Sequence, residues 1–374
     1  MAALGTTLIA ACGADRPPYS TGEGTTTFRD SGPGFDLDGA PIREECGKFE
    51  DGGPCGCVEL NLLTDVPNLY FIVDRSGSML EGNKLSAVRV AIGRVVSKLG
   101  PRASFGAALF PDTRVSTCAA GAEVMSVRRG DSPAGKAGPT TLTLLATTNV
   151  APGGGTPTAA TVRALTDKLT SLKGRTYAII ATDGGPNCNE VRACDVSECM
   201  ANIESAPGCT PNVAPNCCDG ATYGPGNCLD GKATIDAVAA LYAAGVPTYV
   251  IGVPGSGAYA TLLDQVAEAG GTARATSPKY FRVDGTDDTS LNLALAQIAA
   301  KTTATCVLPL SPDPPDPNRV NVYLDDVVVP KDATNGWKLE GATVTLLGTT
   351  CARVLSGEVL GLRVVSGCPT VPPK

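Results

Sequence analysis

The stretch NLYFIVDRSGSM, at positions 68–79, decides the fold of this chain. Its apolar run stops at Asp74, Ser76 and Ser78, and a segment with helical periodicity follows at residues 84–99. A short apolar run that is bounded by turn residues and followed by a helix predicts a buried strand of a parallel sheet. Ligands of open α/β sheets bind beyond the carboxyl ends of the strands, so we expect these polar side chains at a binding site.

The polar residues after this strand have the chemistry of a metal site. A carboxylate and hydroxyls directed at a common centre are hard oxygen ligands, which suit Mg²⁺ or Mn²⁺. The spacing D-x-S-x-S after a first strand resembles the metal-ion-dependent adhesion site of von Willebrand factor type A domains. That family's site also has a Thr in a later loop and an Asp at a later strand end; this chain has Thr156 in GGGTPT (153–158) and Asp183 in YAIIATDGGPN (177–187). The resemblance therefore implies an ion bound by Asp74, Ser76, Ser78, Thr156 and Asp183.

Two simpler interpretations concern the same segments. Asp74 and Ser76 precede a helix, and Asp and Ser are common helix caps. A cap does not account for Thr156 or Asp183, however. A glycine-rich loop before a helix can also bind phosphate, but residues 153–158 match neither G-x-x-x-x-G-K-[ST] nor G-x-G-x-x-G.

The composition excludes several classes of function. The chain has 374 residues, enough for two or three domains, and its acidic residues outnumber the basic ones by 37 to 30. With this net charge and no basic run, we expect no nucleic-acid partner held by phosphate contacts. The chain has no histidine, which excludes Ser-His-Asp and Cys-His catalysis and zinc sites that use imidazole.

The fifteen cysteines predict an oxidising compartment. An apolar run at residues 4–11, too short to span a membrane, ends in Ile-Ala-Ala-Cys and resembles the lipobox of bacterial lipoproteins. The resemblance implies a signal peptide or lipobox at residues 1–12, lipidation of Cys12, and anchoring in the outer membrane or at the cell surface. An ordinary apolar N-terminus is the alternative, since no Lys or Arg precedes the run. Without Cys12, fourteen cysteines remain, an even number suited to seven disulfides.

The rest of the chain divides into a tether, a large domain and a small module. Residues 13–65 lack periodicity and predict a flexible tether. Disulfides of Cys46, Cys55 and Cys57 are expected to cross-link it near its end. Residues 66–305 alternate between strand-like and helix-like segments, which predicts an α/β domain with a doubly wound, mainly parallel sheet. The strand-like segments are 69–73, 103–110, 122–127 (an edge strand), 177–182, 248–253 and 280–283; the helix-like ones include 84–99, 235–244 and 259–269.

A cysteine-rich insertion at residues 188–228 interrupts this alternation. It holds seven cysteines, and five acidic residues against one basic residue. The insertion has no C-x-x-C pair for zinc, so disulfides are the preferred interpretation. Because seven is odd, at least one of these cysteines is expected to pair outside the insertion or to remain free.

Residues 306–374 predict a small antiparallel β module. A Pro-rich linker at 311–317 precedes four alternating segments, at 319–324, 326–329, 342–347 and 360–365. Cys351 and Cys368 flank the last hairpin and are expected to pair. A module of this size has a small core and gains stability from a disulfide and from packing on the large domain.

These features favour a binding protein over an enzyme. An octahedral ion held mostly by neutral hydroxyls keeps positive charge and one exchangeable position, which a Glu or Asp of a protein partner can fill. We expect metal-dependent protein binding, or adhesion, at the bacterial cell envelope, outside the cytoplasm, with the membrane reached only through Cys12. The alternatives are a structural envelope protein whose ion only fixes the loops, and a Mg²⁺-dependent hydrolase. The hydrolase is disfavoured because the motif loops offer no further acid as a general base besides Asp74 and Asp183.

Overall fold

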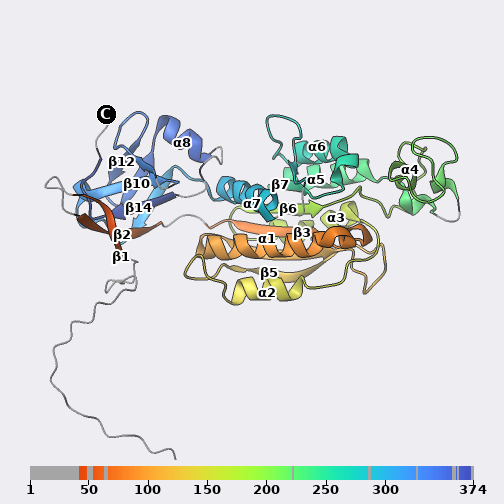
Figure 1. Ribbon diagram of the computed structural model, residues 1–374, viewed down its shortest axis with the longest axis horizontal. Coiled ribbons are helices and arrows are strands. Elements are labelled where there is room, and N and C mark those ends of the chain that lie inside the picture. The colour runs from red at the N-terminus through yellow and green to blue at the C-terminus, as the bar shows by residue number, and fades with distance from the viewer. Residues whose placement is uncertain are drawn as a thin grey trace, which may run out of the picture.

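The computed structural model describes residues 42–48, 54–62, 66–220, 223–284, 288–325, 327–355, 359 and 362–371. These residues form a large α/β domain, with a β module on one side of it and the cysteine-rich insertion on the other (Figure 1). The expected signal peptide, Cys12 and most of the expected tether lie outside the described residues. No helix in the described ranges is both long enough and apolar enough to cross a membrane.

The large domain is built on a six-stranded sheet with the order β5-β4-β3-β6-β7-β8. Neighbouring strands are parallel except β4 and β5, so the antiparallel strand lies at an edge. The chain order runs outward from β3 on one side and then from β6 on the other, which places a topological switch point between β3 and β6. The strands are β3 (Asn68–Asp74), β4 (Ser104–Phe110), β5 (Ala122–Arg129), β6 (Thr176–Thr182), β7 (Thr248–Gly252) and β8 (Phe281–Arg282).

Helices cover both faces of this sheet, and β3 contributes alternate side chains to each face. Leu69, Phe71 and Val73 belong to the core under α1, α2 and α7, whereas Tyr70 and Ile72 belong to the core under α3, α5 and α6. Burial on both faces explains why this strand is continuously apolar in sequence. The helices are α1 (Lys84–Leu99), α2 (Pro139–Thr147), α3 (Thr158–Ser171), α5 (Gly231–Ala243), α6 (Ala260–Ala269) and α7 (Asp288–Thr303). The expected α/β class with a mainly parallel sheet is confirmed.

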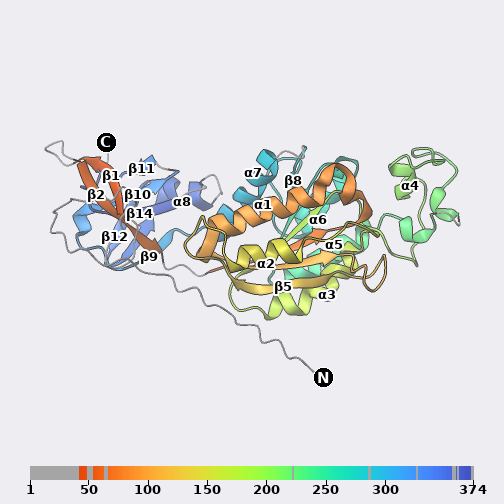
Figure 2. The ribbon, with the colours of Figure 1, turned by 60° about the horizontal axis from the view of Figure 1, so that its bottom comes forward.

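The β module is built from segments that lie before and after the large domain in the chain. This differs from the sequence prediction, which assigned the residues through 65 to a tether. Strand β2 pairs with β14 and with β9, and β1 pairs with β2 (Figure 2). All strand pairs of the module are antiparallel, in the order β11-β10-β14-β2-β9-β13-β12. The strands are β1 (Ile42–Lys48), β2 (Pro54–Leu62), β9 (Val307–Ser311), β10 (Val320–Leu324), β11 (Val327–Val329), β12 (Trp337–Glu340), β13 (Thr343–Leu346) and β14 (Leu362–Ser366).

Two chain segments connect the large domain to the module, and they pair with each other as β2 and β9. Asn61 pairs with Ser311 and Leu62 with Leu310, just before the chain enters the large domain and just after it leaves. The large domain is therefore inserted between two strands of the module. The end of β2 does carry a strand-like alternation, with Val58, Leu60 and Leu62 apolar, but the alternation does not show that its partners include Leu310, about 250 residues away.

Two other details of the module differ from expectation. Cys351 pairs with Cys306 and not with Cys368, which is itself disulfide-bonded. Cys351 lies in the helix α8 (Gly348–Leu355), which the alternating pattern did not predict. The helix packs against the core around Trp337, and this turns Cys351 toward the start of β9.

Disulfides organise the cysteine-rich insertion, whose one α-helix in the described part, α4 (Met200–Ile203), is a single turn. Its described disulfides account for all seven cysteines of the segment. Three bonds lie within the insertion, and the fourth ties its root to the loop between β4 and β5: Cys194–Cys228, Cys199–Cys218, Cys209–Cys217 and Cys118–Cys188. The expected pairing outside the insertion is confirmed by Cys118.

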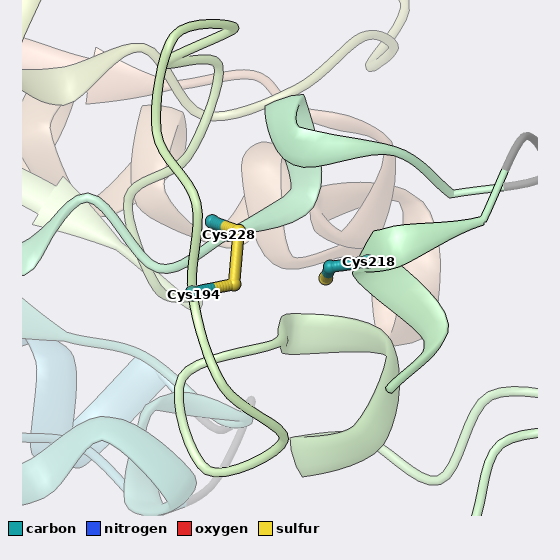
Figure 3. A group of neighbouring side chains, drawn as sticks. All are labelled: Cys194, Cys218 and Cys228. Atoms are coloured by element: carbon teal, nitrogen blue, oxygen red, sulfur yellow. A yellow bond between two sulfur atoms is a disulfide. The ribbon is translucent and has the colours of Figure 1, made fainter. Parts of the chain in front are cut away.

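A cluster of sulfur atoms in the insertion superficially suggests a metal site. The Sγ atoms of Cys194, Cys218 and Cys228 lie within 4.8 Å of one another. Figure 3 shows the disulfide between Cys194 and Cys228, with Cys218 beside it. Cys218 is bonded to Cys199. Metals bind thiolates, and all of these sulfurs are in disulfides, so the disulfide interpretation holds over zinc.

Candidate metal centre

Segments that are far apart in the sequence meet beyond the carboxyl end of β3. The loop after β3 and the glycine loop before α3 are joined by backbone hydrogen bonds, from Gly77 N–H to Gly154 O (2.9 Å) and from Gly153 N–H to Arg75 O (2.7 Å). Strand β6, the neighbour of β3, brings Asp183 to the same edge. This is the switch point, where open α/β sheets bind their ligands.

Asp74 is the last residue of β3 and is fully buried. Its Oδ1 accepts a hydrogen bond from the N–H of Ser76 (2.7 Å), and its Oδ2 accepts one from the hydroxyl of Thr182 on β6 (2.6 Å). The hydroxyl oxygens of Ser76 and Ser78 are 3.2 Å apart. These contacts hold the carboxylate and both serine hydroxyls of the motif together.

The alternative interpretation of Asp74 and Ser76 as helix caps is wrong. Ser76 precedes the 3₁₀ segment η1 (Gly77–Asn83), and its side chain makes no capping hydrogen bond. Helix α1 begins after Asn83, which makes none either. The Asp74 carboxylate bonds to the N–H of Ser76 and to Thr182, and not to an N–H inside the helix.

Asp183 follows β6 and is 2% exposed. Its Oδ1 accepts a hydrogen bond from the hydroxyl of Ser78 (2.9 Å), 105 residues earlier in the chain. Its Oδ2 accepts one from the ammonium of Lys84 (2.8 Å). Asp183, Ser78 and Ser76 thus form a continuous chain of side-chain contacts that ends beside Asp74.

Thr156 is held by the segments on either side of its loop. Its N–H donates to Asn187 Oδ1 (2.7 Å), and its carbonyl accepts from Asn187 N–H (3.0 Å). On the other side, Gly155 N–H donates to Thr117 O (2.8 Å). The Thr156 residue is 4% exposed, and its hydroxyl has no hydrogen bond to the described part of the chain. The hydroxyl is therefore available as a ligand in a fixed position.

The Cys118–Cys188 disulfide lies directly behind the glycine loop. A Cβ on Gly155 would be 2.5 Å from Cys188 Sγ and 3.2 Å from Cys118 Sγ, so only glycine allows this approach. Gly154 has φ +88°, a conformation that L side chains rarely adopt. The loop sequence therefore fits its place between the disulfide and the motif.

The charges of the site are unbalanced toward the negative. Burial and the charge of Asp183 raise the pKa of Asp74 to about 7, against the lowering effect of its hydrogen bonds from Thr182 and Ser76. Burial lowers the pKa of Lys84, but its contacts with Asp183 and Glu81 outweigh burial and raise it. The site therefore holds two buried carboxylates and one buried ammonium, which is paired with Asp183, and a bound cation would relieve the excess negative charge.

The donor set fits Mg²⁺ or Mn²⁺. The expected ligands offer oxygen only, from three hydroxyls and two carboxylates: Ser76, Ser78, Thr156, Asp74 and Asp183. Hard divalent cations prefer such ligands, whereas zinc prefers sulfur and imidazole nitrogen. When bound, the ion would supply a Lewis-acidic position for an oxygen ligand.

Sequence reasoning did not single out Lys84 or Asn187. Lys84 had a usable signal, because it precedes Val88 by four residues and so lies on the apolar stripe of α1, where a lysine needs a buried partner. Asn187 had no such signal. Its role depends on the close approach of the loop after β6 to the glycine loop, which only the tertiary structure shows.

No known protein-family model matches the chain, and no curated protein matches it. Among solved structures, the pilus adhesin SpaC of Lactobacillus rhamnosus GG is similar at 15% identity, with a TM-score of 0.47 over 90% of this chain and 43% of that one. The vWF domain of the type V pili tip protein Mfa5 of Porphyromonas gingivalis gives 14% identity and a TM-score of 0.43, over 63% and 95%. A von Willebrand factor type A protein of Catenulispora acidiphila gives 13% and 0.39, over 86% and 61%. The chain thus spans less than half the length of the SpaC chain.

The strand order and the helices on both sides of the sheet define the fold of the large domain. A six-stranded, mainly parallel sheet with helices on both faces is the doubly wound arrangement that the sequence resemblance implied. The large domain has a von Willebrand factor type A-like fold.

Proposed function

We propose that this protein is a metal-dependent protein-binding module of the bacterial cell envelope. The ion, Mg²⁺ or Mn²⁺, is bound by Asp74, Ser76, Ser78, Thr156 and Asp183, and it binds an exposed Asp or Glu of a protein partner. The observation that supports this proposal is the convergence of the three segments that carry these residues. The end of β3 with the loop that follows it, the glycine loop, and the end of β6 are joined by hydrogen bonds at the switch point of the sheet.

Partner binding fits this site better than hydrolysis. A general base must lie within hydrogen-bond reach of the proton it removes. Both site carboxylates are already engaged, Asp74 with Ser76 and Thr182, and Asp183 with Ser78 and Lys84. Glu81, the next acid in the chain after the motif, contacts Lys84, and the chain has no histidine.

The test compares partner capture with and without the ion. Immobilised wild-type protein is incubated with an envelope extract in Mg²⁺ or in chelator, and the eluted proteins are identified. We expect specific capture in Mg²⁺ only, and loss of capture in Thr156→Val, which removes one hydroxyl ligand. Capture that survives both the chelator and the substitution would instead support a purely structural ion.

A lipid anchor at Cys12 and an extracytoplasmic location complete the proposal. They are supported by the resemblance to a lipobox and by the disulfides, which need an oxidising compartment. Mass spectrometry of the protein purified from membranes should find an acylated peptide that begins at Cys12. Alkylation without reductant should label few of the fourteen other cysteines; labelling of most of them would place the protein in a reducing compartment.

A further inference from the structure

The ammonium of Lys84 lies inside the proposed metal centre. Lys84 is the first residue of α1, and its side chain is 9% exposed. Its Nζ is 2.8 Å from Asp183 Oδ2 and 3.4 Å from Glu81 Oε2. The Glu81 side chain is 77% exposed, so water screens that contact and Asp183 is the main partner.

This placement opposes two electrostatic preferences of a lysine. A buried ammonium is costly unless it is paired, and a cation at a helix N-terminus faces the positive end of the helix dipole. The turn after β7 also covers the pair: Gly255 has φ +108°, and a Cβ on it would lie 3.3 Å from Lys84 Nζ and 3.0 Å from Asp183 O. The Lys84–Asp183 pair is therefore an enclosed part of the site and not a surface ion pair.

The charge of Lys84 changes the net charge that the site has after an ion is bound. With both carboxylates of Asp74 and Asp183 ionised, as ion binding requires, and the Lys84 ammonium beside Asp183, the cluster has one net negative charge. A divalent ion converts that cluster to one net positive charge. Without Lys84, the same ion would leave the cluster neutral. An external carboxylate is attracted to the ion-loaded site that contains Lys84, because that site has a net positive charge. It is attracted only weakly to an ion-loaded site without Lys84, because that site is neutral.

We propose that Lys84 sets the division of binding energy between the ion and the partner. It lowers the affinity of the site for the ion alone, and it keeps the loaded site positive so that a partner's Asp or Glu completes the charge balance. This inference rests on the proposed metal-dependent function and deepens it. Ion and carboxylate then strengthen each other's binding reciprocally, as linkage requires.

The test measures Mn²⁺ binding by calorimetry, in chloride and in acetate at equal ionic strength, with acetate as the carboxylate probe. We expect Lys84→Met and Lys84→Gln to bind Mn²⁺ in chloride about tenfold more tightly than wild type, because a nearby positive charge is removed. Acetate should improve Mn²⁺ affinity in wild type more than in either neutral variant. Lys84→Arg keeps the charge and should behave like wild type in both respects.

Controls separate this inference from general damage. Lys84→Gln keeps a donor for Asp183 Oδ2, which protects against loss of folding, and the gain in thermal midpoint on adding Mn²⁺ should be larger in Lys84→Gln than in wild type. Lys168→Gln removes the ion pair between Lys168 on α3 and Glu123 on β5 and should leave Mn²⁺ affinity unchanged. Neutral variants that bind Mn²⁺ no more tightly than wild type overturn the role of Lys84. A wild-type protein that binds no Mn²⁺ overturns the proposed function itself, and this inference with it.

Discussion

Asn187 and Thr156 bind each other through two hydrogen bonds, with the N–H of Thr156 donating to Asn187 Oδ1 at 2.7 Å and the N–H of Asn187 donating to Thr156 O at 3.0 Å. Asn187 lies four residues after Asp183 and next to Cys188. The paired bonds therefore fix Thr156 relative to the end of β6. Together with the Cys118–Cys188 disulfide, they tie the glycine loop to the start of the insertion.

Thr156→Val should weaken Mn²⁺ binding by about tenfold or more, since one oxygen ligand is replaced by a methyl group of similar shape. The free energy of unfolding without ion should change little, because the hydroxyl has no hydrogen bond to the described part of the chain. Calorimetry and urea denaturation measure the two effects. Thr156→Ser keeps the hydroxyl and serves as the control; equal Mn²⁺ affinity in Thr156→Val and wild type would remove Thr156 from the site.

Removing the Cys118–Cys188 disulfide should lower Mn²⁺ affinity while the domain stays folded. The disulfide joins the two segments that flank the glycine loop, so Cys118→Ser/Cys188→Ser should leave Thr156 less firmly held. The ion must then order the loop when it binds, and this entropic cost reduces the binding free energy. Calorimetry should show several-fold weaker binding. The matched control is Cys306→Ser/Cys351→Ser in the β module, which should change stability and not Mn²⁺ affinity. An equal effect of both pairs would contradict the prediction.

Asp183→Ala should destabilise the protein as well as weaken ion binding. It leaves the Lys84 ammonium buried without its partner, which typically costs about 3–5 kcal/mol. The double variant Lys84→Met/Asp183→Ala removes both charges and should recover much of that loss in urea denaturation. Additive effects of the two single substitutions would show that the ion pair contributes no coupling energy.

Asp131 should stabilise the start of α2 in a pH-dependent way. Partial burial raises its pKa, but hydrogen bonds from the hydroxyl and N–H of Thr141 and the N–H groups of Thr140 and Gly138 outweigh burial and lower it to about 2. Because the folded-state pKa is depressed, the stabilisation is complete above the unfolded-state value of about 4 and is lost as the pH falls toward 2.

Asp131→Ala should therefore lower the free energy of unfolding by about 1–3 kcal/mol at pH 7, through N–H groups left without acceptors. Urea denaturation from pH 6 to pH 2 checks this. The difference between wild type and variant should shrink as the solution becomes acidic. A difference that is constant with pH would show that the carboxylate charge does not matter.

The insertion is expected to influence the choice of partner, because its root lies at the ion-bearing edge and its net charge is negative. It holds five acids against one base, so it should favour basic or mixed-charge partners that offer one exposed acid. Its internal disulfides make it a rigid surface, which lowers the ordering cost of binding.

The disulfide pattern allows a clean deletion. Replacing residues 190–228 by a short Gly-Ser loop removes three complete disulfides and retains Cys188 for Cys118. We expect this variant to bind Mn²⁺ like wild type and to lose capture of the wild-type partner. Retained capture at equal affinity would show that the insertion only shields the sheet.

Local sequence determined the elements of the large domain and most of its proposed ion site. Periodicity predicted α1 with its observed bounds and β3 as a buried strand, because side-chain spacing reports directly on which faces are buried. The proposed ligands were assigned by the resemblance to the metal-ion-dependent adhesion site, and each follows a strand end or a glycine loop, which parallel strands bring to one edge. The structure then placed Ser78 against Asp183 and Ser76 against Ser78, as that logic requires.

Tertiary structure alone decided the features that depend on contacts between distant segments. Strand β2 is part of the β module because β9 and β14 pair with it; the alternation of Val58, Leu60 and Leu62 with polar residues indicates a strand but does not name its partners. The pairing of Cys351 with Cys306 follows from where α8 packs, since spacing along the chain does not set the distance between two sulfurs. Lys84 and Asn187 entered the site for the same reason: a buried charge or amide acquires its role from the partner that the fold brings within hydrogen-bond distance.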